Sequence, residues 1–180
     1  MAKVLYSATM SLDGFIAGAG GDMSWLGAFL GPNPVAEELV PQIGSIVVGR
    51  RTFGGDDPNK DTDKEGAFEG AWHGPQFVLT HKPPAGEPPP GTVFVTDLAT
   101  AITAAKDAAG DKYVNILGAD VARQALAAGL VDEILVFIAP VLLGDGTRLF
   151  TSPGGTNISL DRMSQSEAPL ATGIWYSVIH

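Results

Sequence analysis

The amino-acid sequence predicts an α/β domain with a mainly parallel sheet, helices on both of its faces and antiparallel strands at one edge. Three observations support this prediction. Short apolar runs of strand-forming residues alternate with helical patterns, as in βα units. Several of these runs are apolar at every position, which is typical of strands buried on both faces. Strand patterns without intervening helices fill the last part of the chain. The length suits one domain over residues 1–180.

Strand and helix patterns follow one another along most of the chain. The expected strands are 3–10, 45–49, 76–80, 92–95, 112–118, 131–143 and 171–180. The expected helices lie within 32–44, 97–109 and 119–129. The glycine-rich segment 11–25 and the charged segment 56–74 show no period, so both are expected to be loops.

Residues with strong backbone preferences mark the ends of these elements. Asp97 stands where a helix N-cap is expected, and Gly44 and Gly129 follow the first and third helix patterns. Pro140 lacks a backbone N–H, so the strand that contains it is expected to be interrupted there. The alternating tail over 171–180 predicts a final edge or hairpin strand.

The composition excludes several kinds of site. The chain has no cysteine, which rules out disulfides, thiolate metal ligands and a cysteine nucleophile. Its three histidines, His73, His81 and His180, are not spaced like zinc ligands, so no metal site is expected. The formal net charge of −9 disfavours nucleic acid as a partner.

The N-terminal sequence is a poor signal peptide, because its apolar stretch breaks at Ser11 and Asp13. No apolar run approaches the roughly 18 residues of a membrane span. We therefore expect a cytoplasmic protein that acts on a small molecule and has neither a membrane nor a nucleic-acid partner.

Potential phosphate ligands follow three of the expected strands. In open α/β sheets, ligands bind at the carboxyl ends of the strands. Glycine allows close approach of a ligand, arginine matches phosphate geometry, and a helix N-terminus attracts anions. The three groups are Gly49-Arg50-Arg51-Thr52, Thr80-His81-Lys82 and Gly118-Ala119-Asp120-Val121.

Each group also has an ordinary structural explanation. The arginines suit a solvated strand end, the Thr80 group a polar turn, and the Gly118 group a tight turn between strand and helix. A ligand with several phosphates, such as a dinucleotide, explains all three together. The sequence lacks the G-x-G-x-x-G pattern, which argues against the doubly wound dinucleotide fold.

Longer motifs resemble a known family. The segments MSLDGFIA, VVGRRTF and NILGADVARQALAAGLVDEILVFIAPVLLGDGTRLF occur in the order seen in the dihydrofolate reductase-like superfamily. The stretch from Gly129 to Phe150 is most similar to the reductase domain of the bifunctional riboflavin-biosynthesis deaminase–reductase. The resemblance implies a stand-alone domain of dihydrofolate reductase-like fold. It also implies NADPH as the cofactor, hydride transfer to a small heterocyclic or carbonyl substrate, and a homodimer.

The resemblance assigns cofactor contacts to the three groups. It implies that the Gly49 group holds the cofactor phosphates and that the Thr80 group meets the 2′-phosphate of the adenosine ribose. The Gly118 group is implied to lie under the pyrophosphate, with Ala119 where the family usually has a second glycine. The residues implied to line the nicotinamide are Ala8, Ile16 and Ala17.

The residues expected to bind the substrate differ from those of dihydrofolate reductases and from those of riboflavin-type reductases. Met23 and Trp25 resemble the dihydrofolate reductase segment that closes over the nicotinamide, so they are expected to contact the substrate. The carboxylate that holds the pterin ring has no counterpart near Leu30, since the next acid is Glu37. The arginine that binds a ribose phosphate in riboflavin-type reductases is also missing, because none lies between Trp25 and Arg50.

Two aspartates are candidates for the chemistry. Asp13 matches the acid that lies near the substrate in riboflavin-type reductases, and it is expected to orient the substrate or deliver a proton. Asp13 also suits a turn, and Asp22 is the second candidate. Asp132 and Glu133 are interpreted as a solvated strand start, and Asp145 as part of a turn.

Three functions stay open at this point. The first is an NADPH-dependent reductase. The second is a nucleotide-binding protein that keeps the fold without turnover, and the third is a flavin-dependent protein with the same phosphate contacts. A true dihydrofolate reductase is disfavoured by the missing acid near Leu30. The apolar segment 133–143 and the final strand are candidate contributors to the homodimer.

Overall fold

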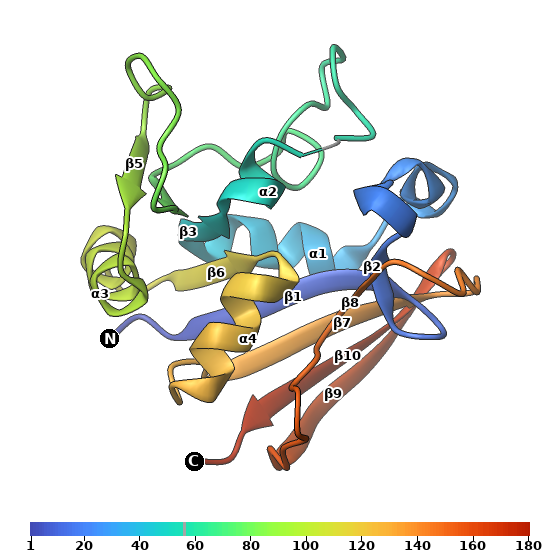
Figure 1. Ribbon diagram of the computed structural model, residues 1–180. Coiled ribbons are helices and arrows are strands. Elements are labelled where there is room, and N and C mark those ends of the chain that lie inside the picture. The colour runs from blue at the N-terminus through green and yellow to red at the C-terminus, as the bar shows by residue number, and fades with distance from the viewer. Residues whose placement is uncertain (56) are drawn as a thin grey trace.

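The computed structural model describes residues 1–55 and 57–180, and its strands form two sheets. The strands are β1 Val4–Ser11, β2 Phe15–Ala17, β3 Ile43–Gly49, β4 Gln76–Leu79, β5 Thr92–Val95, β6 Tyr113–Leu117, β7 Glu133–Ala139, β8 Thr147–Arg148, β9 Leu160–Ala168 and β10 Ala171–Val178. Eight of them form one sheet in the order β5-β4-β3-β6-β1-β7-β10-β9, and β2 pairs with β8 separately (Figure 1).

The large sheet is mixed, and its parallel part is the larger one. β1 lies in the interior, parallel to β6 on one side and to β7 on the other. β3, β4 and β5 extend the parallel part beyond β6. β10 runs antiparallel to β7, and β9 runs antiparallel to β10. The prediction of a mostly parallel mixed sheet with an antiparallel C-terminal edge is therefore confirmed.

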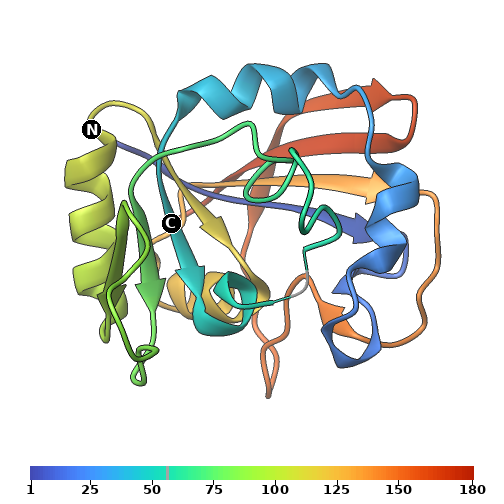
Figure 2. The ribbon, with the colours of Figure 1, turned by 90° about the horizontal axis from the view of Figure 1, so that it is seen from above.

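Helices cover both faces of this sheet. The α-helices are α1 Pro34–Leu39, α2 Arg50–Phe53, α3 Leu98–Ala109 and α4 Ala119–Ala127. Short 3-10 helices are η1 Ala19–Gly21, η2 Ser24–Phe29 and η3 Val40–Gln42. α3 and α4 pack on one face and α1 packs on the other, as expected (Figure 2).

Neighbouring residues of each central strand pack into different layers of the core. Val4 and Val47 are fully buried in the layer under α3 and α4. Leu5 and Ile46, next to them in sequence, are equally buried in the layer under α1. Side chains alternate across a strand, so a strand covered on both faces must be apolar at successive positions. This explains the uninterrupted apolar runs in the sequence.

Two of the expected helix ends are confirmed, and one is wrong. The Asp97 carboxylate accepts a hydrogen bond from the Thr100 N–H at 2.8 Å and caps α3. Gly129, with φ of 64°, follows the end of α4. Gly44 does not end a helix but lies inside β3, where an added Cβ would be 2.7 Å from the Cα of Ala109. Glycine at this position allows α3 to approach β3 closely.

The C-terminal part holds two strands that the sequence did not indicate, β8 and β9. β10 is not the edge strand, because β9 pairs along its outer side, but it forms an antiparallel hairpin with β9, so the hairpin alternative is confirmed. β9 was missed because its residues from Leu160 to Gln165 are all exposed, so they give no apolar alternation. β7 ends at Ala139, so the interruption expected at Pro140 is the end of the strand. The segment 11–25, expected to be a loop, contains β2, η1 and the start of η2.

Glu133 corrects a further expectation. It is only 1% exposed rather than solvated. Its carboxylate accepts hydrogen bonds from Lys3 Nζ at 2.7 Å, Trp175 Nε1 at 2.8 Å and the Tyr113 hydroxyl at 3.0 Å. Burial, together with the hydrogen bond and the charge of Glu133, raises the pKa of Tyr113 to about 12. A buried acid with three donors is stable at the start of a strand, and burial cannot be seen in the sequence pattern.

Candidate functional site

Two of the three groups of residues predicted to bind phosphate, the Gly49 group and the Gly118 group, lie side by side. β3 and β6 are parallel neighbours, so Gly49, the last residue of β3, and Gly118, the residue after β6, lie at adjacent strand ends. An added Cβ on Gly49 would be 3.1 Å from Val121 Cγ2, and the side chain of Thr52 packs directly against Gly118. These contacts bring α2 and the first turn of α4 together.

A cavity of about 430 Å³ opens next to this junction. Its walls come from α2, α4, β2, β8 and the segment 144–151. They are formed by Phe15, Arg51, Ala119, Asp120, Arg123, Gly144, Asp145, Gly146, Thr147, Arg148 and Thr151. Three of these residues are arginines, which is notable in a chain of net charge −9.

Three of the predicted residues, Arg51, Ala119 and Asp120, line this cavity. The Asp120 carboxylate accepts hydrogen bonds from Arg123 Nη2 at 3.1 Å and from Gln124 Nε2 at 3.0 Å, so it is engaged by its own helix. Val121 is 1% exposed and belongs to the core beneath α4. The first turn of α4 presents backbone N–H groups and the positive end of the helix dipole to the cavity.

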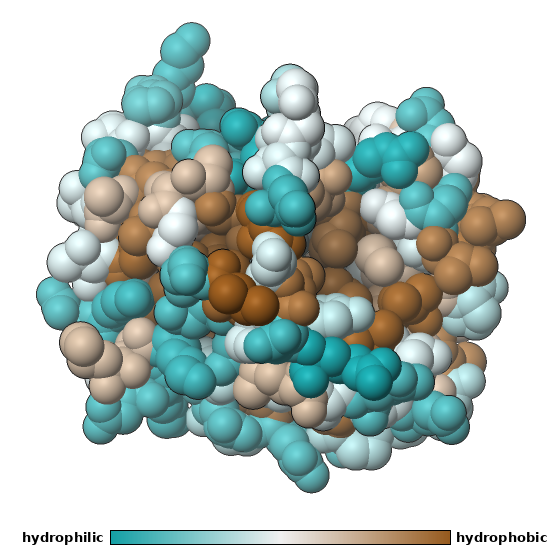
Figure 3. Space-filling model, turned by 90° about the horizontal axis from the view of Figure 1, so that it is seen from below, coloured by the Kyte–Doolittle hydropathy of each residue, from teal (hydrophilic) through white to brown (hydrophobic). Residues whose placement is uncertain are grey.

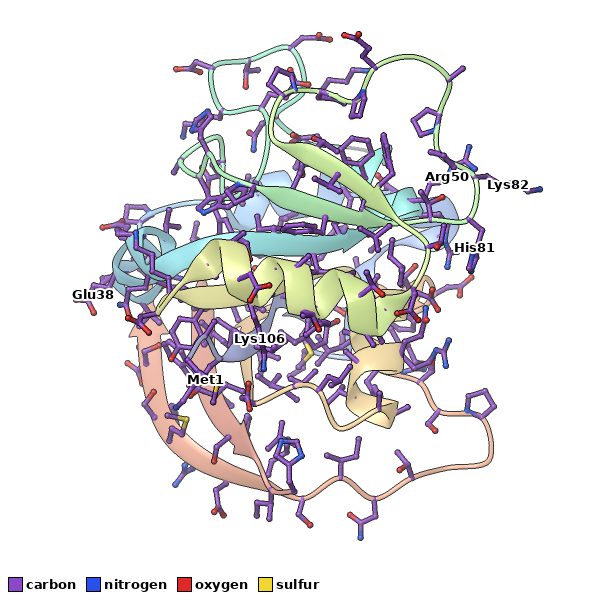
Figure 4. All side chains as sticks on the ribbon, turned by 90° about the vertical axis from the view of Figure 1, so that its left-hand side faces the viewer. Met1, Glu38, Arg50, His81, Lys82 and Lys106 are labelled. Carbon is purple, nitrogen blue, oxygen red and sulfur yellow. The ribbon has the colours of Figure 1, made fainter. Side chains whose placement is uncertain are left out.

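Arg50 does not line the cavity, although it is adjacent to Arg51 in sequence. Arg50, His81 and Lys82 are exposed and lie at the same end of the molecule, where β3 and β4 finish (Figure 4). Thr80 is buried, and its hydroxyl accepts a hydrogen bond from the Lys82 N–H at 3.1 Å. Thr80 therefore shapes the turn that presents the two side chains after it.

The predicted nicotinamide wall lies along β1 and β2. Ala8 is half-buried and packs against the core layer under α3 and α4. Ala17 is buried, and Ile16 beside it is half-buried. Phe15, the first residue of β2, lines the arginine cavity. Ile16 and Ala17 therefore belong to the strand that borders this cavity, whereas Ala8 belongs to β1.

Asp13 connects the turn between β1 and β2 to the segment that follows β7. Its carboxylate accepts hydrogen bonds from the Ser11 hydroxyl at 2.5 Å, the Gly144 N–H at 2.7 Å and the Leu143 N–H at 3.1 Å. The bond from Ser11, followed by those from Leu143 and Gly144, lowers the pKa of Asp13 to about 2. The carboxyl group is therefore ionised near neutral pH and has no proton to donate there.

Asp22, Met23 and Trp25 lie at the start of η2. The Asp22 carboxylate accepts a hydrogen bond from the Ser24 N–H at 2.9 Å, and its pKa is lowered by this bond. Trp25 is half-buried and contacts the Phe29 ring at 6.1 Å between centroids. Its buried Nε1 has no hydrogen-bond partner among the described residues.

No acid takes the place of the pterin-binding carboxylate within the described residues near Leu30. Glu37 is exposed, and its Oε1 accepts a hydrogen bond from the Asn33 N–H at 3.3 Å. It therefore supports the start of α1.

The sequence interpretation missed two arginines of the cavity. Arg123 follows the Gly118 group by one helical turn, and this spacing from Asp120 was a usable signal. Arg148 comes from β8, whose position depends on its pairing with β2. β8 has two residues and β2 has three, and the two strands are far apart in the sequence. A pairing between such short strands leaves no pattern in the sequence. Asp145 lies in the turn that was expected, and it also lines the cavity.

A model of a known protein family matches almost the whole chain. The match is to the RibD C-terminal domain and extends over residues 2–169. The chain belongs to the RibD C-terminal domain family. The resemblance inferred from the motifs is thereby confirmed.

Similar proteins extend the comparison. The uncharacterized protein YyaP of Bacillus subtilis (strain 168) is 28% identical over 157 residues, which are 82% of this chain and 80% of YyaP. The crystal structure of a “Putative riboflavin biosynthesis protein” from Shewanella sp. PV-4 matches with a TM-score of 0.74 and 26% identity, over 100% of both chains.

The fold extends beyond the RibD C-terminal domain family. Dihydrofolate reductase from Enterococcus faecalis, complexed with NADP(H) and RAB-propyl, matches with a TM-score of 0.65 and 15% identity. The match covers 99% of this chain and 97% of that one. The prediction of a dihydrofolate reductase-like fold is confirmed by this likeness.

Two structural findings concern other kinds of site. Across residues 1–55 and 57–180, no helix has both the length and the apolar composition to cross a bilayer. The same residues hold no group of three or more histidine, aspartate or glutamate side chains arranged for a metal ion.

Proposed function

We propose that the protein is an NADPH-dependent reductase that transfers a hydride to a small heterocyclic or carbonyl substrate. Membership of the RibD C-terminal domain family supports an oxidoreductase. The observation that carries the proposal is the arginine-lined cavity at the carboxyl ends of β3 and β6. A dinucleotide diphosphate is the kind of anion that such a cavity binds.

The chain's own residues divide the cofactor contacts between two places. Arg51 and the first turn of α4, beginning at Ala119, are proposed to bind the diphosphate. Arg50, His81 and Lys82 are proposed to bind the 2′-phosphate of the adenosine ribose, because they present several donors at one surface. This division supports a preference for NADPH over NADH.

The remaining predicted residues would hold the reactive end. When bound, NADPH supplies the hydride. Ala8, Ile16 and Ala17 are proposed to form an apolar wall against the nicotinamide, which excludes water. Trp25 is proposed to face the substrate, and its unpartnered Nε1 is a donor for a substrate acceptor atom. Met23, beside it, is proposed to line the same pocket.

The two aspartates receive different roles in this proposal. Asp13 is proposed to position the turn between β1 and β2, since its carboxylate already accepts three hydrogen bonds. Its low pKa argues against the proton delivery that the sequence suggested. Asp22 is proposed to fix the start of η2 through Ser24. Neither group would then be the acid of the reaction.

A titration with the two nucleotides tests the proposal. We expect micromolar binding of NADPH and at least tenfold weaker binding of NADH, followed by nucleotide fluorescence. Arg50→Ala should remove most of this preference, whereas Arg51→Ala should weaken both nucleotides. Arg162→Ala, on the exposed edge strand β9, is the matched control and should change neither. Absence of binding of both nucleotides to the wild-type protein would overturn the proposal.

A second candidate is a nucleotide-binding protein without turnover. The engaged carboxylate of Asp13 favours it, because no free acid then faces the substrate. Tight NADPH binding without oxidation across a panel of pyrimidine, pterin and carbonyl substrates would favour this candidate. The colour of purified protein would identify the flavin-dependent alternative.

We also propose a homodimer built on the C-terminal edge of the sheet. β9 is an edge strand, and exposed apolar side chains lie on it and just after β10, namely Leu160, Met163 and Ile179. Figure 3 shows apolar side chains gathered in the middle of the face seen from below. Light scattering during gel filtration should give twice the mass of 18.6 kDa. Met163→Glu should reduce it, and a wild-type monomer would contradict the proposal. The cytoplasmic location expected from the sequence stays a prediction.

A further inference from the structure

Arg148 lines the cavity, and although it lies within the stretch that resembles the family, the sequence interpretation gave it no role. Its guanidinium carbon lies 4.5 Å from the centre of the Phe15 ring, and its Nη1 donates to the Asp13 carbonyl oxygen at 3.4 Å. Among the described residues, neither Arg148 nor Arg51 forms an ion pair with a carboxylate. Arg123, in contrast, is paired with Asp120 at 3.1 Å. Arg51 and Arg148 are therefore the two cavity arginines without a carboxylate partner in the described part of the chain, while Asp145, which also lines the cavity, accepts only the Gly146 N–H there, at 2.8 Å.

The segment around Arg148 is held firmly against the turn that follows β1. The Leu149 N–H donates to the Gly14 carbonyl at 2.8 Å, and the Asp13 carboxylate accepts from Leu143 and Gly144. Gly146 lies so close to Ala17 that any Cβ at position 146 would collide with the Ala17 backbone. Contacts on both sides of Arg148 therefore fix the position of its backbone.

The stacking on Phe15 orients the guanidinium without using its donors. A cation above a ring face is attracted by the ring quadrupole, while the N–H groups at its edge stay available. Only one of these groups is engaged, in the long bond to Asp13. A planar fork with free donors matches two oxygens of a phosphate group.

We propose that Arg148 is a further anion-binding residue of this cavity and that it binds the diphosphate of the dinucleotide together with Arg51. The inference rests on the proposed function for the identity of the ligand. Binding at Arg148 would also reinforce the contact between β8 and the turn at Asp13. Phosphate binding would then stabilise the strand pair β2 and β8, which borders the proposed nicotinamide wall.

Arg148→Gln tests the proposal, with NADPH and inorganic pyrophosphate as separate probes. Dissociation constants are measured at low and high salt, and melting by circular dichroism checks the fold. We expect Arg148→Gln to weaken both probes at least tenfold and to reduce the salt dependence of binding. Arg148→Lys, which keeps the charge, should recover part of the loss. Arg123→Gln should weaken binding less, because Arg123 is already paired with Asp120.

A variant that leaves Arg148 in place guards against a folding defect. Phe15→Leu removes the ring but keeps the charge, and it should weaken pyrophosphate severalfold. NADPH and pyrophosphate affinities unchanged in Arg148→Gln would overturn the inference and leave the proposed function intact. Pyrophosphate binding that depends on Arg148, in a protein that binds neither NADPH nor NADH, would support the anion site and reject the proposed function.

Discussion

The side chain of Thr52 occupies the space into which a Cβ on Gly118 would project. Gly118 also has a φ of 99°, a conformation that side chains with a Cβ rarely adopt. One residue belongs to α2 and the other directly precedes α4. This contact sets how closely the Gly49 group and the Gly118 group, both predicted to bind phosphate, approach each other.

Gly118→Ala should therefore damage both the fold and the site. The strained backbone alone is expected to cost about 1–3 kcal/mol of unfolding free energy. The displaced Thr52 should move α2, and NADPH affinity should fall at least tenfold in a fluorescence titration. Gly129→Ala is a matched control, since its φ is 64° and an added Cβ meets only His180 Nδ1 at 3.9 Å. It should lose stability but keep affinity, and equal affinities in both variants would contradict this prediction.

Asp13 should make stability depend on pH in the acid range. Its folded-state pKa of about 2 lies below the usual 3.8, so the ionised carboxylate stabilises the fold above the higher value. This contribution should be lost as the pH falls through about 2. The denaturation midpoint of Asp13→Ala should lie below that of the wild type at pH 7, and the gap should close between pH 4 and pH 2. A gap that stays constant over this range would show that the charge does not matter.

Glu133→Ala should destabilise the protein without affecting nucleotide binding. It removes the acceptor of three donors, and the Nε1 of half-buried Trp175 and the hydroxyl of half-buried Tyr113 lose their partner. We expect a loss of about 2–4 kcal/mol in urea unfolding. Glu133 begins β7, at the opposite end of the strand from the cavity, so NADPH affinity should stay the same. Asp111→Ala, which removes a fully exposed ion pair, should change neither quantity.

Asn115→Leu should raise the melting temperature. Asn115 is completely buried in β6, and neither its Nδ2 nor its Oδ1 has a hydrogen-bond partner among the described residues. Leucine has the same branching without the unsatisfied polar atoms, so the replacement should gain about 1–2 kcal/mol. Asn115→Asp should have the opposite effect, because it buries a charge. A lower melting temperature for Asn115→Leu would indicate that an ordered water satisfies the amide.

The parallel part of the sheet was predictable because burial on both faces leaves a clear trace in composition. Val47 and Ile46 had to be apolar together, so the strand was visible. β9 left no such trace, since one of its edges and most of its side chains face solvent. The burial of Glu133 depends on Trp175 and Tyr113, which are distant in sequence. Contacts of this kind arise only from the tertiary structure.

The same limit explains what was found and missed at the site. Arg51 and Ala119 follow strands, and the rule that ligands bind at carboxyl ends was enough to select them. Arg148 enters the cavity through the pairing of two very short strands. The engagement of Asp13 depends on backbone N–H groups 130 and 131 residues away, which no local pattern encodes.

The divergence of Arg50 and Arg51 has a practical consequence for redesign. Only Arg51 lines the cavity, while Arg50 lies with His81 and Lys82 at the surface. On the proposed function, discrimination between the two coenzymes and general affinity for them depend on different side chains. A library that varies positions 50, 81 and 82 and keeps position 51 should therefore contain variants that accept the cheaper coenzyme, NADH, without losing their hold on the diphosphate.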